Sequence, residues 1–132
     1  MSLLKGFHHV SMKCSSHEKF QEDVKFYRDV LGIPLLRSWG GEDPGAMLQI
    51  DGTIIEIFEK GQAGSDTGSI NHFAFLVDDP APCVEAVRKA GYEITQEPFD
   101  LTMEATDGDL PLRVAFCRGP IGEEIEFFSC KK

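Results

Sequence analysis

The chain has 132 residues, of which 42% are hydrophobic and 27% are charged, which is typical of one compact globular domain with a hydrophobic core. Its formal net charge of −9 argues against nucleic acid and anionic membrane surfaces as partners, because both are bound through basic patches. The longest apolar runs are too short to cross a bilayer, so we expect no membrane-spanning segment.

The first half of the chain predicts one strand, one helix and three further strands. The strand is expected over 6–13. In the helix that follows, Ser15 and Glu18 have the spacing of a capping box, and apolar residues recur at helical intervals. Gly32 stands where the glycine that ends a helix belongs. An Asp-Gly pair then predicts a tight hairpin between the last two strands. The three strands are expected over 34–39, 46–50 and 53–59.

The second half repeats this order. It follows a segment, 60–69, that is rich in Gly, Ser and Asp and has no periodicity, as is typical of a linker. A strand is expected over 70–77. The next residues predict a helix that has Asp79 as its N-cap and Pro80 in its first turn, and that ends at Gly91. Three strands are then expected over 92–97, 112–118 and 124–129.

The two halves therefore share the order strand–helix–strand–strand–strand, although their direct identity is weak. The acidic segment 100–109 has no counterpart in the first half, and we expect it to be a loop. We predict one domain over 1–132 that is made of two modules, about 5–59 and 70–130. The predicted fold class is α+β, in which paired βαβββ modules form a curved, partly open mixed sheet around a metal cavity, with the helices outside.

The four cysteines do not have the paired spacing of a disulfide framework or a zinc site. No charged-then-apolar leader opens the sequence. We therefore expect reduced thiols in a cytoplasmic protein.

A histidine in the first strand of each module is matched by a glutamate among apolar residues in the last strand. The pairs are His9 with Glu56 and His72 with Glu126; strand alternation also puts Glu124 on the face of Glu126. For any one of them, a hydrogen-bonded histidine or a solvated carboxylate is the simpler interpretation. An unpaired buried carboxylate, however, costs several kcal/mol. Four such residues at duplicated positions predict one shared metal site.

Nitrogen and oxygen ligands without thiolate suit a borderline divalent metal: Ni, Zn, Co, Fe or Mn. Four protein ligands around an octahedral ion leave two positions for water or for two adjacent substrate oxygens. The ion would then act as a Lewis acid that stabilises an enediolate. Either Glu56 or Glu126 could also act as the base that removes a proton next to a carbonyl. These two glutamates are therefore the predicted catalytic residues, and the predicted partner is a small molecule.

Other polar residues near the predicted site are weaker candidates. His8 points to the face opposite His9, where we expect core packing. His17 falls at the polar start of a helix, where we expect it to be exposed. Lys13 and Arg37 could meet an anionic substrate, although a single basic residue more often belongs to the surface.

The chain resembles the vicinal-oxygen-chelate superfamily over residues 6–129. The segments that carry the resemblance are HHVSM, VKFYRDVLGIPLLR, TIIEIFEKG, INHFAFLVDD and GEEIEFF. Within this superfamily, a His-Glu-His-Glu ligand set is most similar to the small bacterial glyoxalase I enzymes, whereas the epimerases usually carry Gln where this chain has Glu56. The resemblance implies a lyase of the lactoylglutathione lyase type. Such a lyase converts a 2-oxoaldehyde–thiol hemithioacetal to a 2-hydroxyacyl thioester by enediolate proton transfer.

The resemblance also implies substrate contacts and a homodimer. Modules in this superfamily pair within a chain or between chains, and the similarity to glyoxalase I favours pairing between chains. Glyoxalase I enzymes usually carry Arg and Asn four residues after the first and second ligands, to bind glutathione carboxylates. This chain has Lys13 and Lys60 there, and lysine does not reproduce the bidentate geometry of arginine. The thiol (glutathione, CoA or another) and the carbonyl therefore stay open. The alternatives are a methylmalonyl-CoA epimerase-like enzyme and a non-catalytic drug- or metabolite-binding resistance protein.

Overall fold

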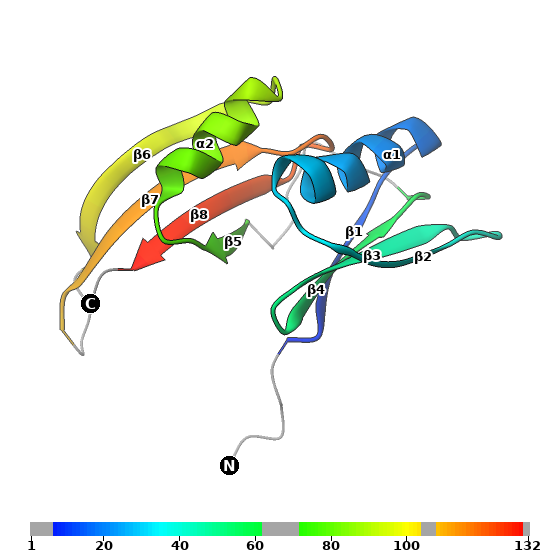
Figure 1. Cartoon of the computed structure of the whole chain (residues 1–132), viewed down its shortest axis with the longest axis horizontal. Helices are drawn as coiled ribbons and strands as arrows, with labels where there is room; N and C mark the ends of the chain where they lie inside the picture. The colour runs from blue at the N-terminus through cyan, green and yellow to red at the C-terminus, as the bar shows by residue number, and fades with distance from the viewer. Residues whose placement is uncertain (1–6, 62–71, 104–107, 131–132) are drawn as a thin grey trace, which may run out of the picture. The chain divides into compact units, whose positions relative to one another are not determined.

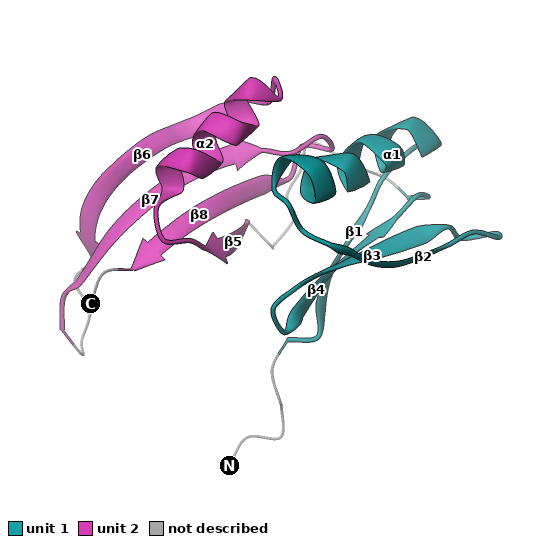
Figure 2. Ribbon diagram, in the orientation of Figure 1, with its two compact units in different colours: residues 1–63 teal, residues 64–132 magenta. Residues whose placement is uncertain are grey.

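The computed structural model describes residues 7–61, 72–103 and 108–130. The chain divides into two compact units, unit 1 over 1–63 and unit 2 over 64–132 (Figure 2). Each unit has the element order strand–helix–strand–strand–strand and a four-stranded mixed sheet (Figure 1). This confirms the α+β fold class and the duplicated βαβββ module.

Unit 1 has a sheet of order β1-β4-β3-β2, in which β1 and β4 are parallel and the other neighbours are antiparallel. The Asp-Gly hairpin lies between β3 and β4 as predicted, with Asp51 in the left-handed region at φ 52°. Its elements are β1 (His9–Lys13), α1 (His17–Lys25), a π-helical turn η1 (Phe26–Val30), β2 (Leu35–Trp39), β3 (Gly45–Ile50) and β4 (Thr53–Phe58).

The first helix begins one residue later than predicted. Ser16, rather than Ser15, is the N-cap: its backbone is extended and its side chain accepts a hydrogen bond of 3.1 Å from the amide of Lys19. An N-cap must combine an extended backbone with an oxygen aimed at the first turn, and two adjacent serines satisfy that pattern equally well in a sequence. Gly32 confirms the predicted end of the helical segment, with φ 76°.

The core of unit 1 lies between the sheet and the helical segment, where α1 contacts β4. Its large side chains that are at most 3% exposed include Phe26, Tyr27, Leu48, Ile55 and Ile57. Full burial of one such side chain stabilises the fold by about 1.5–3 kcal/mol. Because strand side chains alternate between faces, the burial of Ile55 and Ile57 against the helix turns Glu56 toward the opposite face.

Unit 2 repeats this arrangement with sheet order β5-β8-β7-β6, where β5 and β8 are parallel. Its helix starts as predicted, because Asp79 accepts a hydrogen bond of 3.0 Å from the amide of Ala81 and Pro80 occupies the first turn. Gly91 follows the helix at φ 90°. The elements are β5 (Phe73–Leu76), α2 (Pro80–Lys89), β6 (Ile94–Met103), β7 (Leu110–Arg118) and β8 (Glu124–Cys130).

The predicted loop over 100–109 is wrong for its first four residues. Residues 100–103 continue β6, which ends at Met103 rather than at residue 97, and pair with β7. The acidic charge is accommodated because Asp100 lies opposite Arg113, whose guanidinium donates a hydrogen bond of 3.2 Å to its carboxylate. Opposite charges directly across a strand pair stabilise the pairing. Residues 104–107 lie outside the described residues, as do residues 62–69 of the predicted linker.

No helix among the described residues is both long enough and apolar enough to cross a membrane.

Candidate active site

Each unit places its predicted histidine beside its predicted glutamate. In unit 1, His9 Nε2 lies 3.5 Å from Glu56 Oε1. In unit 2, His72 Nε2 lies 3.0 Å from Glu126 Oε1. Two residues that are about half a chain apart in sequence therefore meet in each unit, because the first and last strands of the module are parallel neighbours.

The strand register explains why the two pairs have the same geometry. Ser11 is paired with Glu56 between β1 and β4, and Ala74 is paired with Glu126 between β5 and β8. Each of these partners comes two residues after the histidine, on the same face of the strand. The histidine is thus a diagonal neighbour of the glutamate, at a distance that a long side chain can bridge.

The carboxylates of the pairs are mostly buried, whereas the imidazoles are open. The Glu56 and Glu126 side chains are 11% and 12% exposed, and those of their histidine partners are 40% and 34% exposed. The next strand sets Met47 opposite Glu56 and Phe116 opposite Glu126, so the carboxylates have apolar neighbours. A carboxylate in such surroundings is costly unless a cation or hydrogen-bond donors compensate its charge.

This donor set fits a divalent metal ion. Imidazole nitrogen and carboxylate oxygen, without thiolate, suit Ni, Zn, Co, Fe or Mn, and the partly exposed imidazoles leave room for an ion beside the buried carboxylates. Within residues 7–61, 72–103 and 108–130, no three His, Cys, Asp or Glu side chains come together as a metal-binding group. Each unit therefore offers one pair of candidate ligands.

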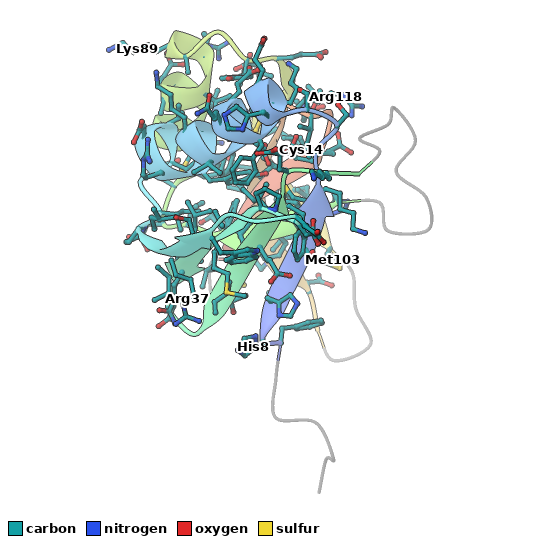
Figure 3. The ribbon with its side chains drawn as sticks, turned by 90° about the vertical axis from the view of Figure 1, so that its right-hand side faces the viewer. His8, Cys14, Arg37, Lys89, Met103 and Arg118 are labelled. Carbon is teal, nitrogen blue, oxygen red and sulfur yellow. The ribbon has the colours of Figure 1, made fainter. Side chains whose placement is uncertain are left out.

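The cysteines are not candidates for this chemistry. None of the four forms a disulfide, and Cys14 and Cys117 are buried. Figure 3 labels Cys14 among the side chains of unit 1. Burial, together with the nearby carboxylates of Glu123 and Glu124, raises the pKa of the Cys117 thiol to about 12. Since the thiolate is the reactive and metal-binding form, these residues do not add to the donor set.

The two lysines predicted to bind substrate lie at one end of the unit 1 sheet. Lys13, the last residue of β1, is paired with Phe58 and packs so closely on Gly61 that a Cβ atom there would lie 2.5 Å from the Lys13 Cβ. Lys60 donates a hydrogen bond of 2.6 Å to the carbonyl of Glu42. The third basic residue, Arg37, is exposed and lies opposite Met47, in the cross-strand row of Glu56.

The expectation of core packing for His8 is wrong. His8 is exposed beside the start of β1 (Figure 3), and its Nδ1 lies 3.0 Å from Nδ1 of His9. Since the strand begins only at His9, alternation does not force the preceding side chain inward. His17 is exposed as expected, and its Nδ1 lies 2.7 Å from a carboxylate oxygen of Glu59.

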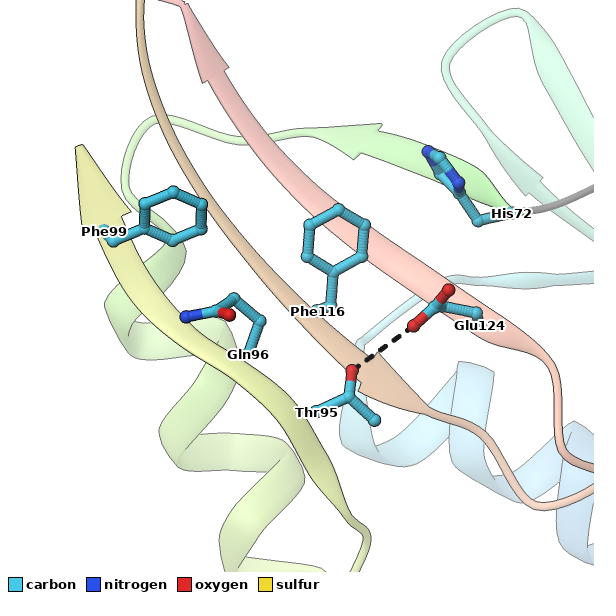
Figure 4. Close-up of a pocket in the computed structure, with 6 residues that line it drawn as sticks. All are labelled: His72, Thr95, Gln96, Phe99, Phe116 and Glu124. Atoms are coloured by element: carbon cyan, nitrogen blue, oxygen red, sulfur yellow. Dashed lines mark hydrogen bonds between the residues drawn. The ribbon is translucent and has the colours of Figure 1, made fainter. Parts of the chain in front are cut away.

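An open pocket of about 310 Å³ adjoins the histidine of unit 2 (Figure 4). Its wall combines two aromatic rings with three polar side chains, and the His72 ring meets the Phe116 ring edge-on at a centroid distance of 5.5 Å. The lining residues are His72, Thr95, Gln96, Phe99, Phe116 and Glu124.

Irregular pairing in β6 shapes this pocket. Gln96 is opposite Phe116, and the register shifts both before it and between it and Phe99. Such bulges re-aim side chains and are enriched beside functional sites. They allow Thr95 and Gln96, neighbours in sequence, to line the same pocket. Sequence reasoning missed the lining residues of β6 and β7, and only the alternation of Glu124 with Glu126 pointed toward this face.

Comparisons with known proteins agree with the fold. The sequence model of the Glyoxalase/Bleomycin resistance protein/Dioxygenase superfamily matches residues 6–127. The chain is 32% identical over 120 residues to a lactoylglutathione lyase of Haemophilus influenzae, with 82% of each chain covered. It is 29% identical over 122 residues to a lactoylglutathione lyase of Salmonella typhimurium, with 84% of each covered.

Solved structures share the fold. A glyoxalase family protein from Enterococcus faecalis matches with a TM-score of 0.71 at 23% identity, covering 96% of this chain and 99% of that one. An antibiotic binding protein from a Streptomyces species, TnmS3, matches with a TM-score of 0.74 at 15% identity, covering 99% and 100%. The duplicated module and the sequence match over most of the chain lead to one conclusion: the chain belongs to the Glyoxalase/Bleomycin resistance protein/Dioxygenase superfamily.

Proposed function

We propose that this protein is a metal-dependent, glyoxalase I-like lyase. It would convert the hemithioacetal of a 2-oxoaldehyde and a thiol into a 2-hydroxyacyl thioester. The observation that carries the proposal is the duplicated His–Glu pair, which has the same strand register in both units. The names of the curated relatives, lactoylglutathione lyases at 32% and 29% identity, support the same activity.

His9, Glu56, His72 and Glu126 would together hold one divalent ion, Ni, Zn, Co, Fe or Mn. When bound, the ion supplies Lewis-acid stabilisation of the negative charge that develops on two adjacent substrate oxygens. The mostly buried carboxylates and the open imidazoles of the two pairs support this assignment.

The proton transfer is assigned to Glu56 or Glu126. In the reaction, the carbon that bears sulfur loses a hydrogen, and the neighbouring carbon gains one. A single carboxylate serves both carbons, because it removes the proton from the first and returns it to the second. The hydroxyl proton of the first carbon moves to the carbonyl oxygen of the second, so that no atom is gained or lost. Both side chains are nearly shielded from water, which helps to retain the transferred proton. The adjacent imidazole helps to orient each carboxylate.

The lysines of unit 1 are the proposed contacts for carboxylates of the thiol. Lys60 already donates one hydrogen bond to the Glu42 carbonyl, and an ammonium group has three donors, so two remain for a substrate. Lys13 extends from the exposed face of β1, the same face as His9. Two cations at one end of the sheet suit an anionic thiol.

Metal content and turnover test the proposal together. The protein is reconstituted with each of the five metals, its ion content per chain is measured, and methylglyoxal is offered with glutathione, CoA and a simple thiol while thioester absorbance is followed. We expect about one ion per pair of units and turnover with at least one thiol. Bound metal without any turnover contradicts the lyase, and an epimerase assay on a CoA thioester then follows. Failure to hold metal favours a binding protein.

We further propose that the protein is a homodimer in which unit 1 of one chain pairs with unit 2 of the other. Closed twofold dimers are the commonest oligomers, and each unit offers only two candidate ligands among its described residues. A monomer in solution that holds its full share of metal would contradict the exchanged arrangement.

A further inference from the structure

The surroundings of the two His–Glu pairs differ at one register position. In unit 1, His9 lies opposite Ile54. In unit 2, Phe73 lies opposite Ile125, so the residues that precede them, His72 and Glu124, face each other. The position that is apolar in unit 1 is thus a carboxylate in unit 2. Unit 2 therefore carries a second carboxylate, on the same strand face as its metal-site glutamate.

This carboxylate is not neutralised by a basic side chain. None of the ion pairs among the described residues includes Glu124. Its carboxylate accepts one long hydrogen bond, of 3.4 Å, from the Thr95 hydroxyl. Arg118 lies opposite it on β7, but its guanidinium donates to the carbonyl of Gly122 at 3.1 Å. The negative charge of Glu124 thus faces the pocket.

Aromatic rings form the rest of the pocket wall. Phe99 and Phe116 line it together with the amide of Gln96 (Figure 4). Phenylalanine rings attract organic cations through their negative faces, whereas they have no ligand atoms for a hydrated metal ion. No Lys or Arg is among the lining residues, so the pocket has no charge partner for an anionic group.

We propose that this pocket binds an alkylammonium group, with Glu124 as counter-ion, the two rings as walls, and Thr95 and Gln96 as hydrogen-bonding partners. Because the pocket adjoins His72, the ammonium belongs to the thiol-bearing part of the substrate, and this second statement rests on the proposed lyase activity.

Binding is measured without turnover, on the full-length, metal-free protein labelled with ¹⁵N. Three probes of one shape are titrated: 2-phenylethylammonium, neutral 2-phenylethanol and anionic phenylacetate. We expect the ammonium to shift the amide signals of the lining residues with a Kd about ten-fold lower than those of the other two probes, since one charge pair near the surface has about this effect. Equal affinity for ammonium and alcohol overturns the proposal, as do shifts that lie elsewhere.

Matched variants separate charge from shape. Glu124→Gln should raise the Kd of the ammonium about ten-fold and leave that of the alcohol unchanged. Phe99→Leu should weaken the binding of the ammonium probe more than that of the alcohol probe. Glu85→Gln removes the same charge from the exposed surface of α2 in the same unit and should change neither Kd. An ammonium Kd that is insensitive to Glu124→Gln overturns the assignment of the counter-ion.

The substrate role has its own readout. In the metal-loaded protein, Glu124→Gln should raise KM for cysteamine as the thiol several-fold, with kcat unchanged, and should leave KM for 2-mercaptoethanol unchanged. Equal KM effects on the two thiols overturn the substrate role. A protein that binds the ammonium probe but turns over no thiol refutes the lyase activity and leaves the ammonium site standing.

Discussion

Unit 1 and unit 2 have the same strand order and the same His–Glu register, but they surround that pair with different chemistry. The cross-strand row through the glutamate reads Ser11, Glu56, Met47 and Arg37 in unit 1, and Ala74, Glu126, Phe116 and Gln96 in unit 2. One unit carries basic residues near its pair, and the other carries aromatic rings and an extra carboxylate. The strand pairing is therefore the same in both units, while the side chains around the His–Glu pair differ.

The outer strands show the same contrast. β2 has five residues and one register shift, whereas β6 has ten residues and two register shifts. Backbone hydrogen bonding tolerates such changes at a sheet edge, so the edge strand can be remodelled without moving the parallel strands that hold the pair.

The largest expected effect comes from the residues that the two units share. Glu56→Gln and Glu126→Gln should each lower kcat by at least about 100-fold, because a positioned acid–base group contributes about 10²–10⁴. Of the two variants, the one that lacks the catalytic base should have the lower kcat. It should also hold more metal than the other variant. Steady-state kinetics and metal analysis on the same samples check this, with Glu85→Gln as control. Equal activity of either variant and the parent protein would exclude that glutamate from the site.

Equivalent core positions compare the stability of the units. Ile57 and Phe127 each follow the site glutamate by one residue, and they are 0% and 1% exposed. Ile57→Ala should cost about 2–5 kcal/mol and Phe127→Ala about 3–5 kcal/mol, since each leaves a cavity in a packed core. Urea unfolding followed by circular dichroism measures both. A cost below about 0.5 kcal/mol at either position would be incompatible with the packing described above.

Mixing two inactive chains tests how the units pair. In an exchanged dimer of His9→Ala with Glu126→Ala chains, one site carries both lesions and the other carries neither. Random mixing makes half of the dimers mixed, each with one intact site, so activity should return to about a quarter of that of the parent protein. Each variant alone is the control. If the units pair within one chain, no activity returns on mixing.

The smallest expected effect distinguishes the two helix caps. Ser16→Ala in α1 and Asp79→Ala in α2 should each lower the free energy of unfolding by about 1 kcal/mol, with the larger loss at Asp79, because its negative charge also interacts with the helix dipole. Ser15→Ala is the matched control and should change stability by less than about 0.5 kcal/mol. A larger loss at Ser15 than at Ser16 would contradict the observed cap.

The sequence by itself determined the order of elements, the ends of the helices at Gly32 and Gly91, the cap at Asp79 and the hairpin at Asp51. Each of these depends on backbone preferences of a few adjacent residues, such as left-handed φ angles and extended caps. The duplicated positions of the His and Glu residues were also visible, and the structure brings them together as a pair in each unit. A single metal ion shared by all four stays a prediction.

Only the tertiary structure decided which residues meet across strands. The extension of β6 through residues 100–103 consists of its pairing with β7, in which Arg113 donates a hydrogen bond to Asp100. The pocket beside His72 depends on the register shifts of β6, and the position of Glu124 opposite His72 appears only once the parallel register is known. Register is set by the packing of whole strands against a core, a long-range interaction that local sequence patterns do not encode.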